Sequence, residues 1–186
     1  LRQTVPARLL RDQISAGHPA GALVASPLLA AAGVLHADPQ LVVMPDDPRL
    51  GEHRAAFAGV LGSIEVRPTD ADDDMASFAG ALDVVSTDAM LRRMENEPAV
   101  RADARAFLEA RLMDLFLGDW DRHRDQWRWA LMARDGARRW VPVPRDRDQA
   151  FAKYDGLVLD LVRYSFPQLL EFGSGYAHPV GATWNG

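Results

Sequence analysis

The chain has 186 residues, of which 48% are hydrophobic and 25% charged, a balance typical of one globular domain with a substantial core. Its formal net charge of −5 argues against a nucleic-acid partner, because phosphate backbones require basic surfaces. The absence of cysteine excludes disulfides and thiolate metal sites, and it leaves the redox compartment open.

The first part of the chain is expected to contain helices and two short strands. Val5–Ile14 has helical spacing, and the apolar run Pro19–Leu35 predicts a buried core helix. That run has 17 residues with Pro27 inside it, which is too short and too interrupted for a membrane span. Leu41–Met44 and Val60–Val66 are expected as strands that are candidates for pairing with each other.

Three further helices are expected in the rest of the chain. Asp88–Glu95 predicts a short helix, and Leu157–Phe172 predicts one near the end. Between them a long helix begins at Pro98, where helices tolerate proline, and ends at Gly118. A stripe of its apolar residues at helical spacing predicts one buried face: Val100, Ala104, Phe107, Leu108, Leu112, Leu115 and Phe116.

A β-hairpin is predicted directly after the long helix. Its arms are Trp127–Arg134 and Ala137–Arg145, joined by Asp135-Gly136, a pair that favours the positive φ values of a type I′ turn. Because the arms have nearly equal lengths, the residues before the hairpin should face Asp146 and Asp148 after it. The residues before it are Asp119, Asp121, His123, Asp125 and Gln126. Carboxylates that converge repel one another unless a cation lies among them, which predicts a divalent-cation site.

The alternating acids of this loop superficially resemble a calcium-binding EF-hand. An EF-hand is excluded, because Arg124 and Ala130 occupy the positions of its glycine and its glutamate. A zinc hydrolase fits poorly, because His123 is the only nitrogen ligand and an oxygen-rich set suits magnesium, manganese or calcium. Neutralisation by neighbouring arginines, without a metal, stays open as an alternative. These arginines are Arg122, Arg124, Arg128, Arg145 and Arg147.

The order of helix, aspartate loop, hairpin and second aspartate motif resembles the C-lobe of a protein kinase. The two motifs are Asp121-Arg122-His123 and Asp146-Arg147-Asp148-Gln149-Ala150-Phe151. They resemble most closely the motifs of atypical kinases of the CotH spore-coat, Golgi casein-kinase and HipA-like families. The resemblance covers Ala99–Phe151. Upstream, the core helix and a hinge strand at Ile64–Val66 are consistent with it.

This resemblance implies a magnesium or manganese ion and ATP as cofactors, with a hydroxyl group as the acceptor. Asp121 would orient that hydroxyl and accept its proton. Asp146 would bind the metal ion that bridges the nucleotide phosphates. Gln126 and Asp148 would complete the ligand shell.

Arg122 and His123 belong to the same catalytic-type loop, and we expect them to brace it rather than to react. Two features depart from the kinase pattern. Gln126 stands where typical kinases have asparagine, and Lys153 is the only lysine, on the wrong side of the site for gripping phosphates. No glycine-rich nucleotide loop precedes the core helix.

We therefore expect an α+β fold, mainly a helical kinase-like C-lobe with a short hinge-type sheet and a hairpin that carries the site. Residues 1–186 would form one domain whose N-lobe is absent, with the core helix and hinge strand in residues 1–68 and the C-lobe in residues 69–186. The chain would then be part of a longer polypeptide.

The expected function is that of a phosphotransferase that binds a divalent cation and nucleotide phosphates. The alternative is a non-catalytic, pseudokinase-like structural or docking module of a larger bacterial envelope protein. The chain is also similar to a bacterial segment of unassigned activity that accompanies calcineurin-like phosphoesterase and outer-membrane barrel domains. Bacterial cytoplasm and periplasm or envelope both stay open as locations.

Overall fold

The computed structural model describes residues 18–70, 76–134, 136–152 and 173. The helices predicted over Val5–Ile14 and Leu157–Phe172 lie outside these residues, as does Lys153. The described part combines helices with two separate sheets, which confirms the expected α+β class. None of its helices is long and apolar enough to cross a bilayer.

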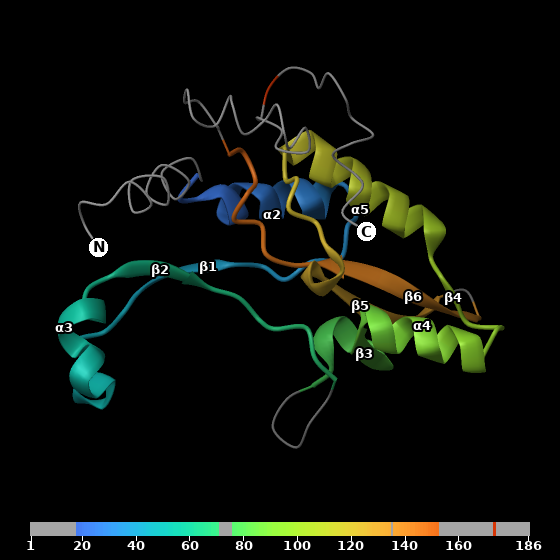
Figure 1. Cartoon of the computed structure of the whole chain (residues 1–186), viewed down its shortest axis with the longest axis horizontal. Coiled ribbons are helices and arrows are strands. Elements are labelled where there is room, and N and C mark those ends of the chain that lie inside the picture. The colour runs from blue at the N-terminus through green and yellow to red at the C-terminus, as the bar shows by residue number, and fades with distance from the viewer. Residues whose placement is uncertain (1–17, 71–75, 135, 153–172, 174–186) are drawn as a thin grey trace, which may run out of the picture.

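A four-stranded sheet with the order β3-β5-β6-β4 is the centre of the fold (Figure 1). Its members are β3 (Asp83–Ser86), β4 (Arg101–Ala102), β5 (Trp127–Arg134) and β6 (Ala137–Pro144). β5 pairs antiparallel with both β3 and β6, whereas the short β4 runs parallel to β6. Neither β3 nor β4 was predicted from the sequence.

The predicted hairpin is confirmed as β5 and β6. Arg134 pairs with Ala137 at its closed end and Trp127 with Pro144 at its open end. Gly136 has a φ of 75°, the left-handed conformation that the Asp-Gly pair favours. Strand alternation sends Trp127 and Trp129 to the face that packs against the helices.

Two helices follow β3 and β4 in the chain: α4 (Thr87–Asn96) and α5 (Ala104–Leu117). α4 confirms the helix predicted over Asp88–Glu95. α5 begins six residues later than Pro98, because Asp103 caps it by accepting a hydrogen bond from Ala106 N at 2.9 Å. Its end is as predicted, with Gly118 in the left-handed conformation at φ 67°.

The face of α5 that was predicted to be buried is largely exposed. The relative exposure is 58% for Leu108, 54% for Leu112 and 60% for Phe116. The buried residues of α5 are Ala110, Asp114 and Leu117. Asp114 turns inward because it pairs with buried arginines of the two motifs, and this electrostatic choice of face outweighs the apolar stripe.

The core helix is confirmed as α2 (Gly21–Ala31), which contacts α5 and buries Ala25 and Leu29 in the main core. Beyond it, β1 (Gln40–Val43) pairs antiparallel with β2 (Leu61–Ile64), as anticipated. The strand ends at Ile64, so the hinge strand predicted over Ile64–Val66 is not formed beyond its first residue.

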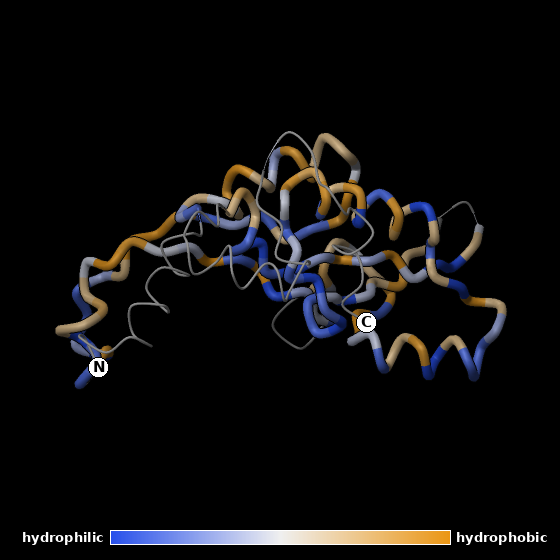
Figure 2. The backbone as a smooth tube through the Cα atoms, turned by 45° about the horizontal axis from the view of Figure 1, so that its top comes forward, coloured by the Kyte–Doolittle hydropathy of each residue, from blue (hydrophilic) through white to orange (hydrophobic). Residues whose placement is uncertain are grey.

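β1 and β2 form an arm that extends away from the body of the molecule (Figure 1). A 3-10 helix (Pro48–His53) and α3 (Arg54–Phe57) connect the two strands at its tip. Its strands expose apolar side chains, with 62% exposure for Leu61 and 58% for Ile64, and Figure 2 shows hydrophobic stretches along it beside hydrophilic ones. It is therefore separate from the core beneath α2 and α5.

Gly21 fixes the distance between α2 and the second aspartate motif. A methyl carbon at Gly21 would lie 2.8 Å from the carbonyl oxygen of Ala150, which is backbone and cannot turn aside. We expect Gly21→Ala to lower the free energy of unfolding by about 1–3 kcal/mol, measured by urea denaturation. Gly62→Ala is the matched control, because nothing lies within 4 Å of that position. Equal stability of both variants would contradict this packing.

Candidate functional site

The open end of the hairpin brings the two sequence motifs together. Gln126 Nε2 donates a hydrogen bond to Asp146 Oδ2 at 3.0 Å, and the backbone N–H of Arg145 donates to Gln126 O at 2.9 Å. Burial raises the pKa of Asp148, and the nearby carboxylates of Asp146 and Asp121 raise it further. The structure thus gathers Asp121, Gln126, Asp146 and Asp148 in one region.

Asp146 has an unusual backbone conformation, with a φ of 57°. Left-handed φ values are uncommon for residues other than glycine, although aspartate and asparagine tolerate them better than most. The conformation lies directly after β6, where the chain leaves the sheet. Strained residues of this kind occur preferentially at functional sites, where the surrounding structure holds them in place.

Asp119 does not face Asp146 and Asp148. The prediction that it lies among the carboxylates at the open end of the hairpin is therefore wrong. Its side chain is fully buried beside Arg122 and Arg147. Burial raises the pKa of Asp119, and the charges of Arg122 and Arg147 oppose that shift. Neutralisation by arginine, which the sequence left open as an alternative, is the correct explanation for this one acid.

The buried ion-pair network around Asp119 also contains Asp114 of α5. Arg147 Nη1 contacts Asp119 Oδ2 at 2.8 Å and also donates to Asp114. Arg111 Nη1 donates to Asp114 Oδ2 at 2.6 Å. The network ties the helix, the loop after it and the second motif together at one buried point.

Arg122 connects this network to the backbone of the second motif. Its side chain is 0% exposed, and its guanidinium donates to Asp119 and to the carbonyl oxygens of Arg145 and Asp146, the last at 3.4 Å. These contacts fix the position of Arg122 between the first motif and the backbone of the second.

His123 and Asp125 form a hydrogen bond with each other within the loop. His123 Nδ1 accepts a hydrogen bond from the backbone N–H of Asp125 at 3.3 Å and so caps the 3-10 helix Arg124–Gln126. Arg124 pairs with Asp88 at the surface, and Asp125 is exposed. These contacts shape the turn that leads into β5.

No three histidine, aspartate or glutamate side chains in the described part of the chain stand in an arrangement that holds a metal ion. Gln126 turns its amide nitrogen to Asp146, which suits a carboxylate without a bound cation. A cation would instead require the amide oxygen, and a half-turn of the amide group supplies it. The available oxygen ligands are those of Gln126, Asp146 and Asp148, a set that suits magnesium or manganese.

A polar cluster on the connection after α2 was not predicted from the sequence. Ser26 Oγ lies 2.5 Å from Asp38 Oδ1 and 3.1 Å from His36 Nε2. It is not a catalytic triad, because the serine lies between the histidine and the aspartate instead of at one end. His36 Nδ1 contacts Val34 O at 2.7 Å, so the cluster fastens this connection to the helix.

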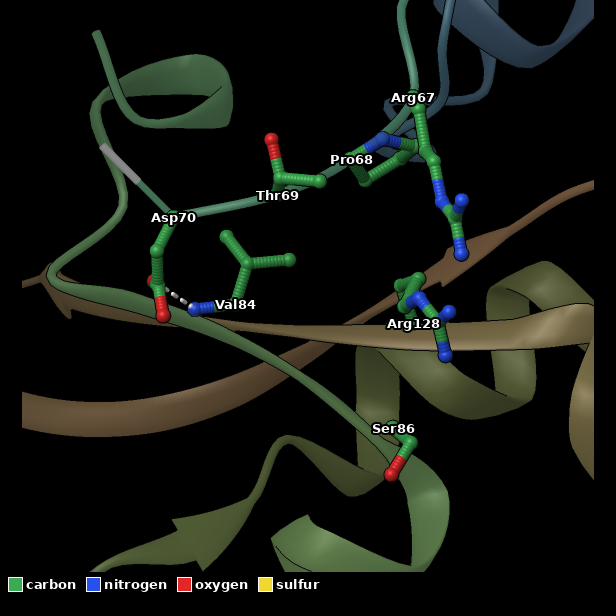
Figure 3. Close-up of a pocket in the computed structure, with 7 residues that line it drawn as sticks. All are labelled: Arg67, Pro68, Thr69, Asp70, Val84, Ser86 and Arg128. Carbon is green, nitrogen blue, oxygen red and sulfur yellow. Dashed lines mark hydrogen bonds between the residues drawn. The ribbon is translucent and has the colours of Figure 1, made fainter. Parts of the chain in front are cut away.

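A cavity of about 300 Å³ on the other face of the hairpin was also not predicted. Arg67 and Arg128 line it (Figure 3). Arg128 could have been found, because strand alternation places it on the face opposite Trp127 and Trp129. Arg67 could not, since nothing local indicates that its segment lies beside β3 and β5.

No protein-family model and no curated protein matches this chain in sequence, so the kinase resemblance depends on the two motifs and on their order.

Proposed function

We propose that this chain is an atypical kinase-like domain that binds a divalent cation and nucleotide phosphates at the open end of the hairpin. Asp146, Asp148 and Gln126 hold magnesium or manganese in this proposal. Asp121 orients an acceptor hydroxyl and takes its proton. The domain then acts as a phosphotransferase.

One contrast among the acids carries the proposal. Asp114 and Asp119 are neutralised by buried arginines. Asp121, Asp146 and Asp148 form no ion pair with any residue in the described ranges. Burial raises the pKa of Asp148, and the nearby negative charges of Asp146 and Asp121 raise it further. A divalent cation supplies that counter-ion, and the arginine network does not reach it.

The arrangement suits phosphoryl transfer, which needs chiefly positioning and charge neutralisation. Arg122 belongs to the loop that carries Asp121, and it donates hydrogen bonds to the carbonyl oxygens of Arg145 and Asp146 at the start of the second motif. The two motifs therefore keep a fixed separation without help from the metal ion. A preorganised site of this kind does not have to reorganise when charge develops in the transition state.

The rival function is a non-catalytic module of a larger envelope protein. The observation that favours it is the lack of three metal-binding side chains in ligand geometry among the residues described. The two functions differ in whether a divalent cation binds at Asp146.

Manganese calorimetry tests the proposal. We expect Asp146→Asn to weaken manganese binding by at least about tenfold, because it removes one ligand charge. Asp46→Asn serves as the control, since Asp46 is an exposed acid that pairs with Arg54 on the arm. The control should stay within about twofold of the natural protein.

Two results would count against the metal site. The first is natural protein that shows no saturable manganese binding. The second is an Asp146→Asn variant that binds manganese as well as Asp46→Asn does. Either outcome leaves the non-catalytic module as the better account of the fold.

A further inference from the structure

The cavity on the outer face of the hairpin is formed by residues 67–70 together with residues of β3 and β5. Its lining residues are Arg67, Pro68, Thr69, Asp70, Val84, Ser86 and Arg128. Figure 3 shows the guanidinium groups of Arg67 and Arg128 close together at one end, with Asp70 at the other. Asp70 is already engaged, because its carboxylate accepts a hydrogen bond from the backbone N–H of Val84.

Neither Arg67 nor Arg128 forms an ion pair within the part of the chain that the structure describes. Arg67 and Arg145 both lie near enough to Arg128 for their positive charges to act on it. Like charges held close together repel one another unless an anion joins them.

Arg145 extends the cluster toward the proposed metal site. Its Nε atom is buried and makes no hydrogen bond within the described structure. Glu65 also lies near Arg145. Arg145 directly precedes Asp146, and Arg128 follows Gln126 by two residues, so the cavity adjoins the open end of the hairpin.

We propose that this cavity binds the phosphate groups of a polyphosphate anion, with Arg67 and Arg128 as its ligands and Arg145 as an added positive charge. The planar guanidinium fork matches phosphate oxygens in pairs, and two forks side by side suit a chain of phosphates. The volume of about 300 Å³ is at the lower end of small-molecule sites. The choice of a polyphosphate over another anion rests on the proposed function.

The cavity is distinct from the two motifs. Neither Arg67 nor Arg128 belongs to them, and the site does not require a metal ion. Lys153 is the only lysine in the sequence. No lysine before the second motif can supply a positive charge for phosphate binding, and the two arginines supply it instead.

The test is calorimetry with inorganic triphosphate in the absence of divalent cations. Natural protein should bind it saturably, and Arg67→Gln and Arg128→Gln should each weaken binding by at least about tenfold. Arg139→Gln is the matched control, because Arg139 is an exposed residue of the same hairpin and its loss changes the net charge equally. Arg128→Lys keeps the charge without the fork and should show an intermediate affinity.

Two further ligands separate the sources of the phosphates. ATP and triphosphate should bind with similar affinity, whereas adenosine should not bind. Binding of adenosine and ATP without triphosphate would overturn the assignment in favour of a base-binding pocket. Equal losses in Arg128→Gln and Arg139→Gln would overturn it as well, because they would show a diffuse attraction to positive charge.

Manganese affinity distinguishes a failure of the phosphate-site proposal from a failure of the proposed function. Arg128→Gln should retain manganese binding, and Asp146→Asn should retain metal-free triphosphate binding. Far-ultraviolet circular dichroism of every variant confirms that it is folded. If the natural protein binds manganese but no triphosphate, the phosphate site is wrong and the metal site is still supported.

Discussion

Replacing Arg122 with methionine should lower the free energy of unfolding by about 3–5 kcal/mol. Its side chain is 0% exposed, and it pairs with Asp119 and Asp114, the latter at 3.4 Å from Nε to Oδ1. Methionine fills similar volume but leaves two buried carboxylates short of positive charge. Breaking one member of a buried network is costly because the remaining charges cannot reach water.

Urea denaturation of Arg122→Met beside Arg138→Met measures this effect. Arg138 pairs with Glu97, but both side chains are about half exposed, at 49% and 53%. Surface pairs of this kind contribute about 1 kcal/mol or less. Similar losses in the two variants would mean that the network around Asp119 does not stabilise the fold as the structure implies.

Trp140→Ala should cost a similar amount, about 3–5 kcal/mol, for a different physical reason. Trp140 is the largest fully buried side chain among the residues that the structure describes, and it lies in the main core on β6. Its removal leaves a cavity between the sheet and the helices that backbone atoms cannot close. The guanidinium of Arg93, 5.8 Å from the ring centroid, would also lose its aromatic partner.

Trp140→Phe separates cavity formation from the loss of a hydrogen bond. The indole N–H of Trp140 is buried without a partner among the described residues, so phenylalanine gives up no hydrogen bond. We expect Trp140→Phe to be much less destabilising than Trp140→Ala. Phe116→Ala, at a residue that is 60% exposed, should change stability by only about 0.5 kcal/mol. A loss at Phe116 equal to that at Trp140 would contradict the observed core.

The site and the stability of the fold are coupled through the second aspartate motif. Arg147 is buried in the network, whereas Asp146 and Asp148 on either side of it are exposed. Alternate residues of one short segment thus serve the core and the surface. Variants at Asp146 should therefore affect ligands more than folding, and variants at Arg147 should do the opposite.

The sequence by itself determined the local elements whose signals are chemical and short-range. Asp135-Gly136 favours positive φ values and placed the hairpin turn correctly, and Gly118 marked the end of α5 for the same reason. The nearly equal arm lengths then predicted that Gln126 would face Asp146, and the 3.0 Å hydrogen bond between them agrees with this. These features depend on the backbone conformations that individual residues favour and on the number of residues between them. Both can be read from the sequence.

Only the tertiary structure decided which acids are neutralised and which face of α5 is buried. Asp119 and Asp121 look alike in sequence, but Arg122 and Arg147 enclose only Asp119. The apolar stripe of α5 predicted the wrong buried face. The buried face carries Asp114, which pairs with Arg122 and Arg147, 8 and 33 residues further along the chain. Side-chain charge acts through space at distances set by the fold, so spacing along the chain could not reveal these partners.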